Sequence, residues 1–132
     1  MGQQQLLLIV LGVIIVGIAV VVGINVFTAS SLEANKSALV SDLQTIASMS
    51  QQYYRKPTAM GGGGNTFTGW TVPNALTRTA NMSANVVATV AAQTISLVAT
   101  GTEDGSDGSK GTVTLYINPN SIDSVKFSAN YQ

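Results

Sequence analysis

An uninterrupted apolar run near the N-terminus constrains the fold of this chain more than any other feature. The run has 22 residues, from Leu6 to Phe27, and each is Leu, Ile, Val or Phe except for Gly12, Gly17, Ala19, Gly23 and Asn25. A helix of about 20 apolar residues crosses the roughly 30 Å hydrocarbon core of a membrane. Each large apolar residue near the helix centre favours insertion by about 0.3–0.6 kcal/mol. The run therefore predicts a helix that lies in lipid or is buried among other helices.

A cleaved signal peptide and a single-span anchor are the simpler interpretations of this run. A signal peptide has a basic N-terminal region and an apolar stretch of about 7–15 residues, whereas Met-Gly-Gln-Gln-Gln has no basic residue and the run is longer. An anchor fits the length and stays open as an alternative. On a 3.6-residue helix Gly12, Ala19 and Gly23 share one face, with Gly17 away from it. Small residues let helices approach closely, so the pattern favours a helix packed among other helices.

The residues that follow the run continue as a helix with one apolar face. No proline interrupts the chain before Pro57, and Arg55 and Lys56 suit the negative end of a helix dipole. We expect one nearly continuous helix from Leu6 to about Tyr54, roughly 70 Å long at 1.5 Å per residue, with a local break near Gly17, Gly23 or residues 28–31 as an open alternative. The apolar face recurs at helical spacing and consists of Leu32, Leu39, Leu43, Ile46, Ser50 and Tyr53.

Alternation of apolar and polar residues predicts three half-buried strands in the last third of the chain. They centre on residues 95–99, 113–117 and 125–129. A fourth strand is expected within residues 85–92, and residues 66–72 form either a short edge strand or a loop. Residues 100–111 are expected to form a long hairpin loop, and residues 118–121 a tight turn with Pro119 at its second position. The four consecutive glycines at 61–64 predict a flexible connector, because no Lys-Ser/Thr pair follows to make a phosphate-binding loop.

Together these elements predict an α+β fold, in which a long N-terminal hydrophobic-then-amphipathic helix packs on a small C-terminal antiparallel β-sheet. Residues 1–27 form the hydrophobic helix, 28–56 its amphipathic continuation, and 57–132 the Gly-rich loop and β domain. A domain of this size without disulfides buries little apolar area alone, so we expect its sheet to cover the helix. The expected helix–sheet packing residues are Leu39, Leu43, Ile46, Tyr53, Ile95, Leu97, Val113, Leu115, Ile117, Val125 and Phe127.

The composition argues against catalysis and nucleic-acid binding. The chain has no histidine and no cysteine, and its six basic residues balance six acidic ones, so the commonest general base and any basic footprint are missing. The single acidic cluster, Glu103, Asp104 and Asp107, does not match the EF-hand spacing, and a solvated hairpin tip is the preferred interpretation. Asn35 and Asn81 match the glycosylation sequon, for which chance occurrence is the preferred explanation. We expect no enzyme activity, no catalytic residue, no metal, no cofactor and no small-molecule substrate.

The order of apolar helix, amphipathic helix, glycine loop and small antiparallel sheet resembles type IV pilins and pseudopilins. The stretches QQQLLLIVLGVIIVGIAVVVGI and SALVSDLQTIASMSQQYYRKP carry the resemblance, which covers essentially the whole chain. It implies a prokaryotic subunit held first in the inner (cytoplasmic) membrane and then assembled with copies of itself into an extracellular fimbrium on the cell surface. Roles in adhesion or motility are compatible with it. The helix core of that homopolymer would contain Gln3, Gln4, Gln5, Leu6, Leu11, Gly12, Gly17, Ala19, Gly23 and Phe27.

The N-terminus differs from the family pattern in two respects. Pilin precursors carry a short basic leader that ends in glycine and is removed; Gly2 is the matching position here, and whether Met1 is retained stays open. The family's glutamate near the mature N-terminus is replaced by Gln5 or Leu7, depending on where the chain starts. We therefore expect amide hydrogen bonds of Gln3, Gln4 and Gln5 to replace the ion pair between neighbouring subunits.

Three other functions stay open beside the filament subunit. The chain fits a pseudopilin of a secretion or uptake system, which forms a short filament. It also fits a monomeric, single-span, membrane-anchored extracytoplasmic binding or sensor domain, or an anchored adhesin. The glycine face and the long helix favour the two filament-forming proteins, and nothing in the sequence separates a major subunit from a minor one.

Overall fold

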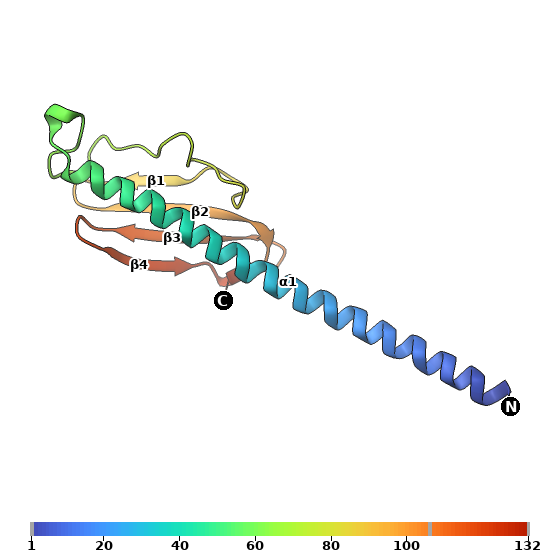
Figure 1. Cartoon of the computed structure of the whole chain (residues 1–132). Helices are drawn as coiled ribbons and strands as arrows, with labels where there is room; N and C mark the ends of the chain where they lie inside the picture. Colours follow the sequence, from blue (N-terminus) through green and yellow to red (C-terminus); the bar gives the residue numbers. More distant parts are fainter. Residues whose placement is uncertain (1, 106, 132) are drawn as a thin grey trace. The chain divides into compact units, whose positions relative to one another are not determined.

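The computed structural model describes residues 2–105 and 107–131; Met1, on which the leader prediction depends, lies outside them. The chain forms two compact units, Met1–Ser31 and Leu32–Gln132, which we call the N-terminal unit and the C-terminal unit. One helix, α1 (Gly2–Arg55), contributes to both units, and four strands follow it (Figure 1). The fold is therefore α+β, as the sequence predicts. The helix has no break near Gly17, Gly23 or residues 28–31, so that alternative is wrong.

The sheet is a four-stranded antiparallel meander. Its strands are β1 (Val87–Val90), β2 (Ile95–Asp104), β3 (Lys110–Ile117) and β4 (Ile122–Phe127), and they lie side by side in sequence order. The alternation in the sequence fixes which side chains share a face, because residues two apart in a strand point the same way. On β2 and β3, alternate residues are buried and the others are half-exposed. The strands are longer than expected, since β2 and β3 extend into residues 100–111 and leave only Gly105–Ser109 as the connection.

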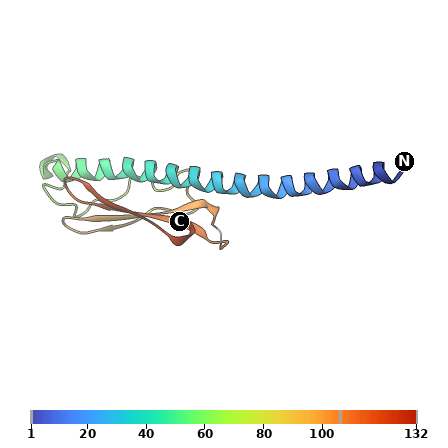
Figure 2. The same ribbon diagram turned by 90° about the horizontal axis from the view of Figure 1, so that it is seen from below.

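Within the C-terminal unit, the last turns of α1 lie along one face of the sheet (Figure 2). Leu39, Leu43 and Ile46 are wholly buried there in one core cluster with Leu97 and Leu115. These helix residues are spaced by four and three, so they project from one side of α1, and the helix and the sheet remove each other's apolar faces from water. The core of the C-terminal unit therefore lies between α1 and this face of the sheet.

The glycine loop closes the C-terminal end of α1. The backbone N–H groups of Gly63, Gly64 and Asn65 donate to the carbonyl groups of Tyr53, Lys56 and Tyr54 at 2.8, 3.0 and 2.8 Å. These carbonyls belong to the last turn of the helix and its end, where intrahelical partners are missing. The prediction of a plain connector therefore missed a capping role. Residues 66–72, for which a strand was one alternative, form a loop that places Phe67 and Trp70 in the core.

Candidate assembly surface

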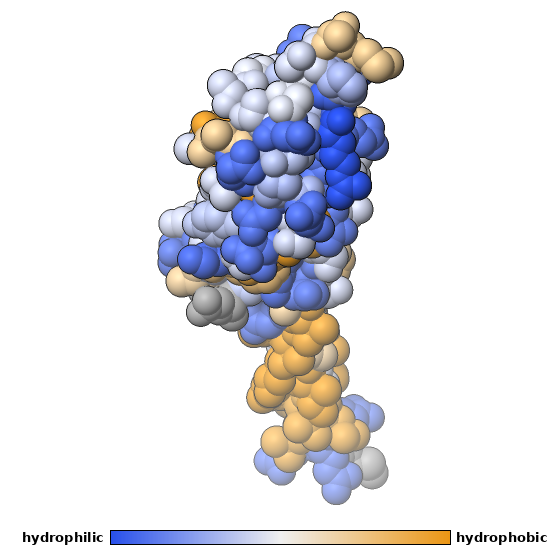
Figure 3. Space-filling model, turned by 90° about the vertical axis from the view of Figure 1, so that its left-hand side faces the viewer, coloured by the Kyte–Doolittle hydropathy of each residue, from blue (hydrophilic) through white to orange (hydrophobic). Residues whose placement is uncertain are grey.

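The N-terminal unit is a single stretch of α1 with an apolar surface. Its residues from Gly2 to Ala29 are all exposed, and the exposed fraction is 64% for Leu6, 53% for Leu11 and 75% for Phe27. In Figure 3 this part of the surface is almost entirely hydrophobic up to its glutamine end, whereas the visible face of the C-terminal unit is largely hydrophilic. Among the described residues, α1 is the one helix that is long and apolar enough to cross a membrane.

The helix-core residues predicted from the sequence all lie on this surface. Gln3, Gln4 and Gln5 form its first turn, and Leu6, Leu11, Ala19 and Phe27 lie further along α1, where all of them are exposed. The three glycines have no packing role within the described chain. A Cβ atom placed at Gly12, Gly17 or Gly23 would meet nothing within 4 Å, although glycine lowers helix stability by about 1 kcal/mol relative to alanine. Any packing role of these glycines therefore lies outside the chain.

The residues predicted to pack helix on sheet lie in or against the core of the C-terminal unit. Tyr53, Val125 and Phe127 are partly buried and contact the core. The others are at most 1% exposed: Leu39, Leu43, Ile46, Ile95, Leu97, Val113, Leu115 and Ile117.

A buried polar cluster at the start of the C-terminal unit escaped the sequence analysis. The Asn35 amide nitrogen donates to the Asn81 carbonyl at 3.0 Å and to the Thr102 hydroxyl at 3.2 Å, and its amide oxygen accepts from the Tyr131 hydroxyl at 2.8 Å. Asn35 lies four residues before Leu39, so its position on the buried face was a usable signal. Because its amide nitrogen is buried and bonded, a glycan cannot attach there in the folded unit.

Tyr131 fits a slot in the sheet that two glycines leave open. A Cβ atom at Gly111 would overlap the Tyr131 ring, and one at Gly101 would overlap the Tyr131 hydroxyl and the Asn35 amide oxygen. Burial raises the pKa of the Tyr131 hydroxyl, with a further contribution from the negative charge of Glu103. The hydroxyl is thus held in its neutral, donating form, as its bond to Asn35 requires.

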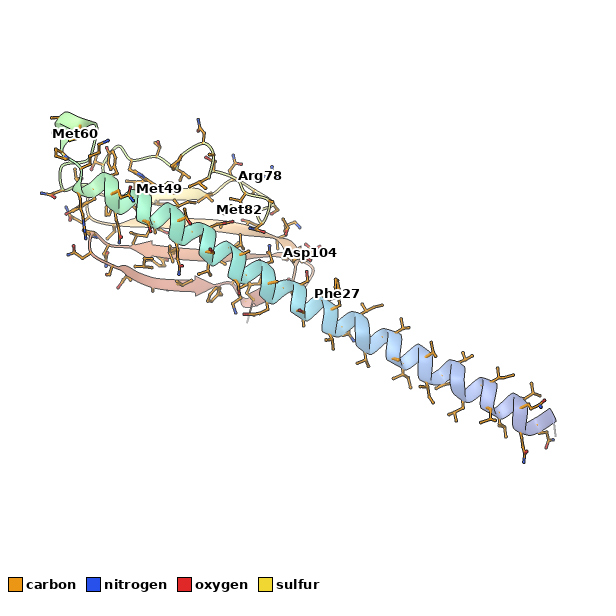
Figure 4. The ribbon with its side chains drawn as sticks, in the orientation of Figure 1. Phe27, Met49, Met60, Arg78, Met82 and Asp104 are labelled. Atoms are coloured by element: carbon orange, nitrogen blue, oxygen red, sulfur yellow. The ribbon has the colours of Figure 1, made fainter. Side chains whose placement is uncertain are left out.

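A second polar contact ties the 79–81 loop to the helix. The Asp42 carboxylate accepts from the Thr79 hydroxyl at 2.6 Å and from the Asn81 amide at 3.1 Å. Asn81, the second sequon, is therefore engaged in holding this loop. Met82, the residue that follows Asn81 and is labelled in Figure 4, is 2% exposed and belongs to the core.

Two further features of the C-terminal unit bear on ligand binding. Among residues 2–105 and 107–131, no three His, Cys, Asp or Glu side chains lie close enough together to hold a metal ion. An open hollow of about 250 Å³ lies beside the last turns of α1 and is lined by Ser48, Gln51, Gln52 and Arg55. The Gln51 amide is already bonded to the Asn118 carbonyl at 3.2 Å. The surface that most distinguishes this chain is therefore the apolar one on the N-terminal unit.

An N-terminal apolar helix whose continuation packs on a small antiparallel sheet is a pilin-like architecture. Comparison of the chain with known protein families, with characterised proteins and with solved structures finds no match. The resemblance to pilins therefore rests on the order of the elements and on the composition of the helix.

Proposed function

We propose that this chain is the structural subunit of an extracellular helical filament of the type IV pilus kind, with no enzymatic role. In this proposal the N-terminal unit lies in the inner membrane before assembly and in the filament core afterwards. The C-terminal unit forms the filament surface. The observation that carries the proposal is the uncharged apolar surface of residues 2–29, which no other part of the described chain covers.

The absence of charge supports both stages of this proposal. All charged side chains lie at or after Glu33, so the whole N-terminal unit enters lipid or a dry protein core without placing a charged side chain there. Exposed apolar patches larger than a few hundred Å² mark membrane or protein interaction sites. Lipid and copies of the same helix are the two environments that satisfy such a surface.

The glycines favour copies of the helix over lipid alone. Gly12, Gly17 and Gly23 have no packing partner within the described chain, and small residues serve helix–helix contacts in membranes by allowing close approach. The C-terminal unit supports self-association as well, because Arg78 is the one charged residue between Pro57 and Thr102. A head-to-tail contact that does not close on itself produces a filament.

Electron microscopy and mass spectrometry of material sheared from the cell surface test the proposal. We expect filaments whose tryptic peptides include this chain, and the N-terminal peptide will also show whether Met1 is kept. Recovery of the chain solely as a detergent-solubilised monomer, with no filament, would instead identify a membrane-anchored domain. A short, membrane-associated filament released only after cell disruption would identify a pseudopilin.

Glycine variants separate filament packing from simple anchoring. Gly12→Ile and Gly23→Ile fill the shared small face, and both make membrane insertion more favourable. We expect normal amounts of membrane-bound chain but at least a tenfold loss of sheared filaments. Gly17→Ile, which lies off that face, is the matched control and should lose less. Equal, normal filament yields for all three variants would contradict a glycine-mediated core.

A further inference from the structure

Asn25 is the one residue between Leu6 and Phe27 whose side chain has hydrogen-bond donors and an acceptor. It lies on α1 in the N-terminal unit and is exposed among valine and isoleucine side chains. Its amide provides two N–H donors and one acceptor oxygen. In lipid or in an apolar filament core, an amide without hydrogen-bond partners is unfavourable, because it loses its hydrogen bonds to water.

Asn25 makes no side-chain hydrogen bond within residues 2–105 and 107–131. Thr28, three residues later, shows the contrast, because its hydroxyl donates to the Ile24 carbonyl of the preceding turn at 3.0 Å. In this way a threonine hydroxyl, which has one hydrogen to donate, finds an acceptor in the backbone of its own helix. The larger Asn25 amide is left to find partners on another molecule.

Amide partners for Asn25 in the N-terminal unit of a second copy lie at only a few levels along the helix. Apart from Asn25 itself, the residues from Leu6 to Phe27 offer no hydrogen-bonding side chain, whereas Gln3, Gln4 and Gln5 offer three amides. Asn25 lies 20 to 22 residues after these glutamines, which is about 30–33 Å along an α-helix. Within the N-terminal unit, parallel copies delivered from one membrane therefore bring Asn25 to an amide of another copy at two displacements, zero or about 30–33 Å. The hydroxyl groups of Thr28, Ser30 and Ser31 lie three to six residues after Asn25, but each has one hydrogen to donate, whereas an amide has two.

We propose that Asn25 sets the axial register of the filament by hydrogen-bonding to the Gln3–Gln5 turn of a second copy displaced by about 30–33 Å. This inference rests on the proposed filament function. A growing filament needs a non-zero displacement between the copies that make this contact, which selects the second of the two values. Apolar packing is non-directional and tolerates slippage between helices rich in Leu, Ile and Val. A single buried amide penalises slippage, as a lone Asn does in the core of a coiled coil.

The first test is the helical symmetry of the wild-type filament by cryo-electron microscopy. We expect one pair of contacting copies to be displaced axially by about 30–33 Å, with the Asn25 amide beside Gln3, Gln4 or Gln5 of the other copy. A filament whose contacting copies show no displacement in this range would overturn the register proposal and leave the filament function intact. Complete absence of filaments would overturn the proposed function and the register proposal with it.

The second test compares two variants that remove one polar group each from the same helix. Asn25→Leu removes the amide, and Thr28→Val removes the hydroxyl that is already satisfied within the helix. With equal amounts of membrane-bound chain, we expect Asn25→Leu filaments to lose their single axial repeat or to fall at least tenfold in yield. Thr28→Val filaments should match the wild type, and Asn25→Gln, which keeps an amide, should retain filaments. Asn25→Leu filaments with the wild-type repeat and yield would overturn the proposal.

Discussion

The two units of this chain treat apolar side chains in opposite ways. In the C-terminal unit Leu39, Leu43 and Ile46 are wholly buried, and every buried side-chain nitrogen or oxygen atom among the described residues has a hydrogen-bond partner. In the N-terminal unit Leu6 and Leu11 are more than half exposed on the same helix. The contrast shows that one helix has two roles. Its later turns complete the core of the C-terminal unit, whereas the apolar side chains of its earlier turns are not covered by the described chain. The same kind of substitution should therefore lower the free energy of unfolding of the C-terminal unit when it is made in that unit, and should leave it unchanged when it is made in the N-terminal unit.

Truncation of a leucine should give the largest difference in the free energy of unfolding between a variant in the C-terminal unit and one in the N-terminal unit. Leu43→Ala opens a cavity in the core and should lower the free energy of unfolding of the C-terminal unit by about 2–5 kcal/mol. Leu11→Ala, in the N-terminal unit, should leave it unchanged. Trp70 is the single tryptophan and is 7% exposed in the C-terminal unit, so its fluorescence during urea unfolding in mild detergent reports on that unit. Equal destabilisation by both variants would contradict the separation of the two units.

Substitution of a glycine by alanine should give the next largest difference in the free energy of unfolding between the two units. A Cβ atom at Gly111 would overlap the Tyr131 ring, whereas one at Gly17 would meet nothing within 4 Å. Gly111→Ala should therefore destabilise the C-terminal unit by about 1–3 kcal/mol, the usual range for overpacking. The same Trp70 titration should show no loss for Gly17→Ala. If Gly111→Ala unfolds at the wild-type urea concentration, Tyr131 does not occupy its slot in solution.

The regular part of the C-terminal unit followed from local sequence patterns. The 3.6-residue spacing of Leu39, Leu43 and Ile46 identified the buried helix face, and strict alternation located β2 and β3, because both patterns depend on residues close together in the chain. Tyr131 was missed since its slot exists only after β2 and β3 pair and bring Gly101 and Gly111 under it. Phe67 and Trp70 were missed because a loop has no periodicity.

For the N-terminal unit, the structure confirms the predicted helix but does not test its contacts with other molecules. Its length and composition predicted a long apolar helix, which the structure has. Its assembly contacts stay predictions, because the atoms that would cover Leu6, Gly12 or Phe27 belong to lipid or to other copies of the chain. A single chain, whether as sequence or as structure, contains only half of each such contact.

Removal of the Tyr131 hydroxyl should have a moderate effect that depends on pH. Tyr131→Phe leaves the buried Asn35 amide oxygen without its donor and should destabilise the C-terminal unit by about 1–2 kcal/mol at neutral pH. Because the pKa of Tyr131 is raised above its ordinary value of 10.0 by burial and by Glu103, the neutral hydroxyl stabilises the fold fully below pH 10.0. This stabilisation is lost as the pH rises above 10.0 and through the raised pKa.

Urea titrations at several pH values between 8 and about 12, followed by Trp70 fluorescence, check this pH dependence. The gap between the wild type and Tyr131→Phe should narrow above pH 10. Tyr116→Phe, on the other face of the sheet, controls for general effects of tyrosine removal. A constant gap across this range would show that the pKa of the Tyr131 hydroxyl is the same in the folded and the unfolded chain.

Threonine replacement should give the smallest difference, and it compares two hydroxyl groups with different partners. The Thr79 hydroxyl donates to the Asp42 carboxylate across a loop–helix contact at 2.6 Å, whereas the Thr28 hydroxyl donates to its own helix. Thr79→Val should lower the free energy of unfolding by about 1 kcal/mol, a typical value for one partly buried hydrogen bond, because the Asn81 amide still bonds to Asp42. Thr28→Val should leave Trp70-detected unfolding unchanged. A Thr79→Val variant as stable as the wild type would mean that Asn81 alone holds the loop to α1, and Asn81→Ala would then show the larger loss.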